Sequence, residues 1–190
     1  MQVFFDIDTQ IDFLFPAGAL YSPGAETLIP AIRTLNTFAV KNGIVLISTT
    51  CAHTEDAAEF KVWPPHCIKG TVGQLKPAAT IVPGQIILEK NELDLFSNPD
   101  LPGLLDRLEI TDCFVYGLLT EYCVKCAIMG LLKTGRKVNL ITDAIIHLNQ
   151  ETAQHVIADF KAAGGVCVTL AEATSSSWRL PNTAPAGGSV

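Results

Sequence analysis

Short apolar runs alternate along this chain with segments of helical periodicity, and this alternation restricts the possible folds more than any other feature of the sequence. Runs such as "QVFFDI", "IVLIST" and "KVNLIT" carry apolar residues at consecutive positions, which is typical of parallel strands buried on both faces of a sheet. Helices between such strands must then cover both faces. The alternation therefore predicts an α/β fold, a three-layer αβα sandwich around a mainly parallel, Rossmann-like sheet.

The individual elements follow from the same pattern. Strands are predicted near residues 2–8, 44–49, 85–90, 111–119, 137–142 and 166–170, with helices over 25–43, 121–133 and 151–163. In the helix over 25–43, one face collects Leu28, Ile32, Leu35 and Ala39, and Gly43 stands at the expected C-cap. Residues 51–84 are rich in Pro, His and acidic residues and too long for a plain connection, so they form a candidate binding loop.

Composition limits the classes of protein that fit. A chain of 190 residues with 48% hydrophobic and 17% charged residues suits one globular domain, which we assign to residues 1–172, followed by a Ser/Pro/Gly-rich tail over 173–190. The net charge of −6 gives no electrostatic reason to bind nucleic acid or an anionic membrane. No apolar run approaches the ~18 residues of a membrane span. Six cysteines, and a start without a basic leader, predict reduced thiols in a cytoplasmic protein.

Reactive side chains stand where three predicted strands end. Asp8 follows the first strand, Lys90 ends the third, and Cys123 lies just beyond the fourth. Ligands of open parallel sheets bind beyond the carboxyl ends of the strands, so these residues are candidates for one site. If Thr120 caps the following helix, Cys123 lies in its first turn, where the positive helix end lowers a thiol pKa. The sequence predicts a nucleophilic cysteine, although small buried cysteines are also common at such positions.

A rival interpretation uses Cys123 together with Cys126. Their C-x-x-C spacing at a helix start is also typical of a thiol-redox pair or of half a zinc site. A redox pair leaves Asp8 and Lys90 without a role, and no second C-x-x-C completes a zinc site. A non-catalytic binding protein on the same fold is a further alternative. We favour Cys123 as a single nucleophile and Cys126 as a packing residue.

Four motifs, in order and spacing, resemble the isochorismatase-like cysteine hydrolases, most closely the nicotinamidases. They are "DIDTQIDF" near the start, "WPPHCIKGT" at 63–71, "EKNELDLFSNPDL" at 89–101 and "GLLTEYCVKCA" at 117–127. The resemblance covers about residues 3–170 and implies the isochorismatase-like hydrolase fold. It implies a catalytic triad of Asp8, Lys90 and Cys123. It also implies a cis peptide at Leu118–Leu119 and an oxyanion hole made by the backbone N–H groups of Leu119 and Cys123.

The same resemblance implies a substrate pocket and a metal loop. Phe13 and Trp63 match positions that line an aromatic-ring pocket in nicotinamidases, and Phe96 is expected to add a wall. In the metal loop the candidate ligands are Cys51, His53, Glu59 and His66. Nicotinamidases have an aspartate where Cys51 stands, so the site either uses a thiolate ligand or is lost. The expected metal is Zn²⁺ or another divalent transition metal, and no organic cofactor is expected.

The resemblance implies hydrolysis of a small carboxamide, above all nicotinamide to nicotinate and ammonia, through a Cys123 thioester. Another small amide or a carbamoyl compound is the alternative substrate for the same triad. Isochorismate hydrolysis is disfavoured, because that vinyl-ether chemistry does not need a cysteine nucleophile. Members of the family are commonly oligomeric, which implies a homo-oligomer.

Overall fold

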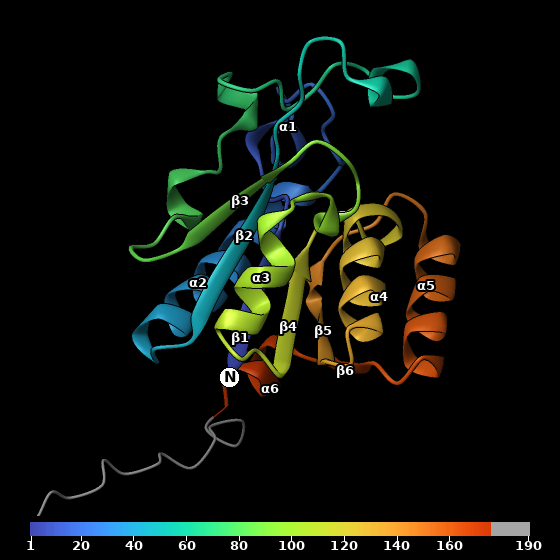
Figure 1. Ribbon diagram of the computed structural model, residues 1–190. Coiled ribbons are helices and arrows are strands. Elements are labelled where there is room, and N and C mark those ends of the chain that lie inside the picture. The colour runs from blue at the N-terminus through green and yellow to red at the C-terminus, as the bar shows by residue number, and fades with distance from the viewer. Residues whose placement is uncertain (176–190) are drawn as a thin grey trace, which may run out of the picture.

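Six parallel strands form a single sheet in the computed structural model, which describes residues 1–175 (Figure 1). The strands are β1 (Gln2–Ile7), β2 (Val45–Cys51), β3 (Ile86–Lys90), β4 (Asp112–Gly117), β5 (Lys137–Ile145) and β6 (Val166–Val168). Their order is β3-β2-β1-β4-β5-β6, and every neighbouring pair is parallel. The order reverses between β1 and β4, which is where open sheets of this kind bind ligands.

Helices cover both faces of the sheet. One face packs against α1 (Ile11–Leu14), α2 (Ile29–Lys41) and α6 (Leu170–Ala173), and the other against α3 (Asp100–Arg107), α4 (Lys125–Lys133) and α5 (Gln150–Ala162). Successive side chains of β1 point to opposite faces of the sheet. Val3, Phe5 and Ile7 therefore pack in one hydrophobic core, and Phe4 packs in the other. The predicted three-layer αβα sandwich is confirmed.

The sequence pattern located α2 well. Leu28, Ile32, Leu35 and Ala39 are buried on one face as predicted, and Gly43 has a φ of 66° just after the helix. The first turn of the predicted helix is a separate 3₁₀ turn, Ala25–Leu28. Helix α3 was not predicted, because Pro and Gly are the third and fourth residues of "DLPGLLDR" and hide its periodicity.

The candidate binding loop has little regular structure. It contains short 3₁₀ turns at Ala58–Lys61, Val72–Gln74 and Ala78–Thr80, and a single β-bridge joins His53 to Ile68. Figure 1 shows this cyan-to-green segment beside α1 at one end of the sheet. The loop therefore begins over the strand ends, whereas its turn at Ala78–Thr80 packs on helix α2.

The predicted boundary at residue 172 falls inside α6, whose last residue, Ala173, is buried. The rest of the predicted tail lies, after residue 175, outside the described residues. Within residues 1–175, none of the helices has the length and apolar character needed to cross a membrane.

A buried ion pair between Lys76 and Asp6, near the end of β1, was not predicted from the sequence. The Lys76 ammonium lies 2.9 Å from the Asp6 carboxylate, and both side chains are almost completely buried. Asp6 also accepts hydrogen bonds from Thr9, at 2.6 Å, and Asn36, at 2.9 Å. Lys76 also donates to the Thr9 hydroxyl. The network ties the candidate binding loop to β1.

Replacement of Lys76 by methionine should destabilise the fold strongly. Lys76→Met leaves the Asp6 carboxylate buried without its cation, so we expect the free energy of unfolding to fall by about 3–5 kcal/mol. Urea denaturation measures the change. The exposed Lys161 provides the control, because Lys161→Met should change stability by no more than about 0.5 kcal/mol. Equal stabilities of the two variants would contradict a structural role for this ion pair.

Candidate functional site

Asp8, Lys90 and Cys123 lie together at the carboxyl ends of β1, β3 and β4. The Lys90 ammonium is 2.8 Å from Asp8 Oδ2 and 3.5 Å from Cys123 Sγ. It also donates to the backbone carbonyl of Glu92 at 2.9 Å. Asp8 is fully buried, and Lys90 and Cys123 are 4% and 7% exposed. The structure thus brings the three residues of the predicted triad into one buried cluster.

The backbone at each strand end fixes this geometry. Asp8 has a positive φ of 50°, and its carboxylate accepts a hydrogen bond from the Thr49 hydroxyl at 2.7 Å. Gly117, which ends β4, has a φ of 119°, and a Cβ there would lie 2.2 Å from the Ile7 carbonyl oxygen. The predicted cis peptide at Leu118–Leu119 follows directly and is present. Only glycine lets β4 approach β1 this closely before the chain turns toward Cys123.

The turn that carries Cys123 differs from the prediction. Thr120–Val124 form a π-helical turn before α4, and Leu119, rather than Thr120, is its N-cap residue. The Thr120 hydroxyl donates to the Ile146 carbonyl at 2.9 Å, so it does not cap the helix. Glu121 accepts hydrogen bonds from the N–H groups of Leu148 and Asn149 and thereby anchors the turn to the loop before α5. The wider π turn was not visible in the sequence pattern.

Charge in the cluster is dominated by the ion pair. Burial opposes ionisation of Asp8, but the Lys90 ammonium and hydrogen bonds from Cys123 and Thr49 outweigh it, so the pKa of Asp8 is lowered. Burial likewise opposes the charge on Lys90, yet Asp8 and the two nearby thiols raise its pKa well above the usual lysine value. Asp8 is a carboxylate and Lys90 an ammonium at neutral pH.

The surroundings of the Cys123 thiol favour its protonated form. A hydrogen bond with the Cys51 thiol and burial raise the pKa of Cys123 well above the ordinary cysteine value, and the Lys90 ammonium offsets this only in part. This corrects the prediction that the helix end lowers the pKa. Deprotonation of Cys123 therefore requires an acceptor, and the neighbouring Asp8 carboxylate is placed to provide it.

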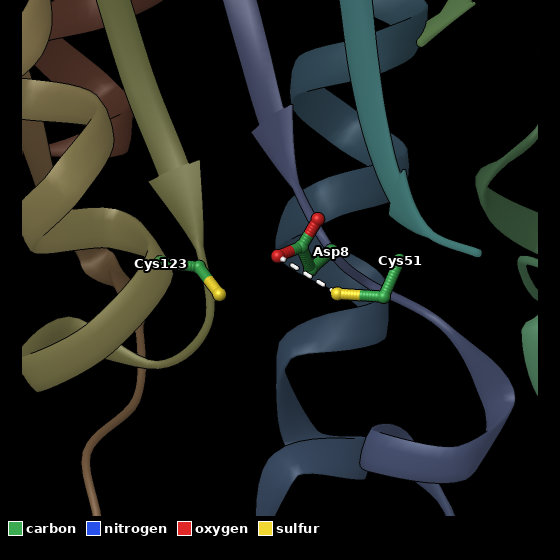
Figure 2. A group of neighbouring side chains, drawn as sticks. All are labelled: Asp8, Cys51 and Cys123. Atoms are coloured by element: carbon green, nitrogen blue, oxygen red, sulfur yellow. Dashed lines mark hydrogen bonds between the residues drawn. The ribbon is translucent and has the colours of Figure 1, made fainter. Parts of the chain in front are cut away.

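Cys51 is the member of the cluster that sequence reasoning placed elsewhere. Its Sγ lies 3.3 Å from the Lys90 ammonium and 3.6 Å from Asp8 Oδ2. Figure 2 shows the Cys51 and Cys123 sulfur atoms directed toward each other beside the Asp8 carboxylate. Cys51 ends β2, two residues after Thr49, so both side chains leave the strand on the side of Asp8. That periodicity was the available signal.

A second cluster, separate from the ion pair, has the donors of a metal site. The ligand atoms of His53, Glu59 and His66 lie within 4.8 Å of one another. His53 Nδ1 donates to the Asn91 side-chain oxygen at 2.9 Å, and His66 Nδ1 donates to the Pro64 carbonyl at 2.8 Å. This leaves the Nε2 atoms for the cluster, where His53 Nε2 lies 3.5 Å from Glu59 Oε2. Within the described residues, the buried His53 Nε2 has no hydrogen-bond partner. Such outer hydrogen bonds typically orient metal-binding histidines, so the donors fit a divalent transition metal.

Cys51 does not join these ligands, which corrects the predicted four-ligand set. Among the described residues, the Cys51 thiol is not grouped with the donor atoms of His53, Glu59 and His66, and it contacts Asp8 and Lys90 instead. Asp8, Cys51 and Cys123 also form a compact group of donors. The Lys90 ammonium already contacts all three of them, which leaves a cation no place there without displacing Lys90.

Two residues of the first motif hold the loop over the site. The Gln10 side chain accepts from the Cys51 N–H at 2.7 Å and donates to the carbonyls of Cys51 and Gln74. Asp12 accepts from the Cys67 N–H at 2.7 Å, immediately after His66. A Cβ on Gly73 would lie 2.2 Å from the Asp12 carboxylate. Asp12 thus fixes the metal loop rather than contributing to the triad.

A pocket of about 520 Å³, including its open mouth, connects the two clusters. Cys123 and Cys51 lie at one side, and Glu59 and His66 at another. The whole lining comprises Phe13, Leu20, Tyr21, Ser22, Cys51, Glu59, Trp63, His66, Leu93, Leu118, Leu119, Tyr122, Cys123 and Leu148. Its apolar and aromatic walls suit a small ring-containing ligand.

The aromatic wall agrees only partly with the prediction. Phe13 and Trp63 line the pocket as expected. The ring centroids of Phe13 and His66 are 5.4 Å apart, with the ring planes tilted by 56°. Tyr122, which was not predicted, meets Trp63 edge to face at 5.4 Å. Phe96 is not among the described lining residues and packs against α4, where a Cβ on Gly130 would lie 2.7 Å from its ring. The predicted Phe96 wall is corrected to Tyr122.

The arrangement has known counterparts. Residues 2–172 match the Isochorismatase domain family. The nicotinamidase of Escherichia coli is 27% identical, over 87% of this chain and 93% of that protein. The pyrazinamidase of Pyrococcus horikoshii in complex with zinc superposes with a TM-score of 0.84 and 25% identity, over 88% of this chain and 98% of that chain. The PnC1 protein of L. infantum in complex with nicotinate gives 0.80 and 26%, over 88% and 92%. This chain belongs to the isochorismatase domain family.

Proposed function

We propose that this protein is an amidase that hydrolyses nicotinamide to nicotinate and ammonia through a thioester on Cys123. The observation that carries the proposal is the buried Asp8–Lys90 ion pair beside the Cys123 thiol at the base of an aromatic-walled pocket. Similarity to nicotinamidases and to a nicotinate complex supports this substrate. The triad roles below are part of the proposal.

Asp8 acts as the general base in the first step. It accepts the Cys123 thiol proton as the sulfur attacks the carboxamide carbon, and Lys90 stabilises the negative charge that is shared by thiolate and carboxylate. The raised pKa of Cys123 makes this transfer necessary, because little thiolate exists in the resting protein. The ion pair keeps the Asp8 carboxylate ready for the proton.

The oxyanion of the tetrahedral intermediate is held by the backbone N–H groups of Leu119 and Cys123. Both residues line the pocket, and Leu119 contributes to the cis peptide. Loss of one oxyanion donor typically raises the barrier by about 2.7–4 kcal/mol. Asp8 then gives its proton to the leaving ammonia. In the last step the Asp8 carboxylate accepts a proton from a water molecule, which attacks the thioester and releases nicotinate.

The pocket favours a flat aromatic amide over an aliphatic carbamoyl compound. Trp63 and Tyr122 form an edge-to-face pair on one wall, and Phe13 lies beside His66. Aromatic faces and edges of this kind stabilise a ring by offset or edge-to-face contact. A carbamoyl compound lacks the ring that these side chains would contact.

The proposal includes one divalent transition metal, Zn²⁺ in the first instance, held by His53, Glu59 and His66. Burial lowers the pKa of His66, which keeps its ring neutral and able to bind a metal. Glu59 and His66 also line the pocket. A bound metal would supply a Lewis-acidic position for the ring nitrogen of the substrate or for a water molecule. The similar pyrazinamidase was solved with zinc.

Location and assembly are part of the same proposal. All six cysteines are free thiols, which suits the reducing cytoplasm predicted from the sequence. A homo-oligomer remains a prediction from the family resemblance.

Removal of the nucleophile should abolish turnover. We expect Cys123→Ala and Asp8→Asn to lower the rate of ammonia release from nicotinamide by roughly 10⁴- to 10⁶-fold. Cys126→Ser should retain turnover, because Cys126 lies outside the pocket lining on α4. The measurement is a coupled ammonia assay on a panel that also contains an aliphatic carbamoyl compound.

Each outcome separates two interpretations. Turnover that survives Cys123→Ala would rule out the covalent mechanism, and loss of turnover in Cys126→Ser would favour the dithiol. Faster release from the carbamoyl compound than from nicotinamide would move the substrate assignment to the alternative class.

Zinc binding should depend on the histidines and not on Cys51. After removal of metal by a chelator, the protein should bind one equivalent of Zn²⁺ in competition with a chromophoric chelator. His53→Ala and His66→Ala should lose stoichiometric binding, because each removes a ligand atom. Asn91→Ala, which frees the outer nitrogen of His53, should weaken binding roughly 10- to 100-fold.

Cys51→Ser is the matched control for the ligand set. It should bind Zn²⁺ as the unchanged protein does, because the Cys51 thiol faces Asp8 and Lys90. A loss of binding in Cys51→Ser as large as that in His53→Ala would show that Cys51 is a ligand.

A further inference from the structure

We propose that Cys51 and Cys123 form a reversible disulfide when the protein meets a hydroperoxide, so that the catalytic centre contains its own redox modification site. Cys51 is the resolving thiol for an oxidised Cys123. The loss of amidase activity that follows rests on the proposed function, whereas formation of the disulfide does not.

The two sulfur atoms are already neighbours. Their ligand atoms, with a carboxylate oxygen of Asp8, lie within 4.8 Å of one another, and the sulfur atoms face each other in Figure 2. Each contacts the same ammonium, since Lys90 Nζ is 3.3 Å from Cys51 Sγ and 3.5 Å from Cys123 Sγ. A disulfide needs an S–S distance of about 2.05 Å, so a side-chain rotation must bring the sulfurs together.

Oxidation of Cys123 requires the same deprotonation as the proposed amidase reaction, because the thiolate is the form that attacks a peroxide. The Lys90 ammonium stabilises negative charge on either sulfur, and Asp8 can accept a proton from Cys123. Cys51 and Cys123 both line the pocket, which gives a molecule as small as hydrogen peroxide a route to them. The amide substrate uses the same route, so exposure of the nucleophile to oxidants accompanies its function.

One molecule of hydrogen peroxide is enough to form the disulfide. The Cys123 sulfur attacks the O–O bond, which breaks to give the Cys123 sulfenic acid and one water molecule. The Cys51 sulfur then attacks the sulfenic sulfur, and the S–S bond forms as hydroxide leaves with the Cys51 proton as a second water molecule. Two thiols are oxidised by two electrons in total, and the peroxide is reduced. An external dithiol reverses the change.

Cys51 thereby protects the nucleophile. A sulfenic acid without a neighbouring thiol is oxidised further to sulfinic and sulfonic acids, and such oxidation is not reversed by ordinary reductants. The other cysteines are less suitable partners. Cys126 does not line the pocket, and the Cys67 thiol is directed to the Gly73 carbonyl at 3.9 Å.

The test is a peptide map of the whole protein after peroxide treatment. Reduced protein is treated with a small excess of hydrogen peroxide, the excess is removed with catalase, and free thiols are alkylated under denaturing conditions. Mass spectrometry of the unreduced digest should find the peptides of Cys51 and Cys123 linked, with a loss of two hydrogen atoms. Nicotinamide turnover should fall in proportion to the linked fraction and return with dithiothreitol.

Two variants sharpen the result. In Cys51→Ser, Cys123 should be recovered as sulfinic or sulfonic acid, and dithiothreitol should not restore the activity that this variant had before treatment. Cys126→Ser should behave as the unchanged protein does.

The proposal is overturned if both thiols remain alkylatable after peroxide treatment, or if oxidised Cys123 is found linked to Cys126. It is also overturned if Cys51→Ser recovers as completely as the unchanged protein. The peptide map decides the matter even if nicotinamide proves not to be a substrate, so failure of the disulfide and failure of the proposed function are distinguishable.

Discussion

The candidate site depends on one buried interaction, the ion pair between the Lys90 ammonium and the Asp8 carboxylate. Burial alone would neutralise both groups, and each remains charged because the other is 2.8 Å away. The pair also determines the charges that surround the Cys51 and Cys123 thiols. Lys90 contacts the Cys51 and Cys123 thiols, and the Asp8 carboxylate lies beside them, so the proposed proton transfer and nucleophilic attack would be coupled at one point.

The parallel sheet brings the triad residues together, and the candidate binding loop adds part of the pocket wall, through Glu59, Trp63 and His66. Asp8, Lys90 and Cys123 follow β1, β3 and β4 at the carboxyl edge of the sheet, as parallel topology allows. Gln10 and Asp12 then fasten the loop to the start of the chain, so that His66 lines the same pocket as the two thiols. The first motif thus supports both clusters, although Asp8 is its only member in the proposed triad.

Features that depend on strand periodicity and on where strands end could be predicted from the sequence. The sheet, the buried face of α2 and the meeting of the three triad residues follow from that local pattern. Contacts made by irregular backbone were not predictable in the same way. Cys51 was a candidate ligand because it stands where nicotinamidases have an aspartate, whereas its thiol groups with Asp8 and Cys123. Phe96 was expected in the pocket wall, whereas it packs on Gly130. The Asp6–Lys76 pair was missed because its lysine comes from the loop.

The most direct test of the central claim is a crystal structure of the protein with the aldehyde analogue of nicotinamide. An aldehyde resembles the transition state once a nucleophile adds to it. The account predicts a bond from Cys123 Sγ to the carbonyl carbon, with the oxygen bound by the N–H groups of Leu119 and Cys123 and the ring between Phe13 and Trp63. An aldehyde bonded to another side chain, or bound in the pocket without a covalent bond, would contradict it.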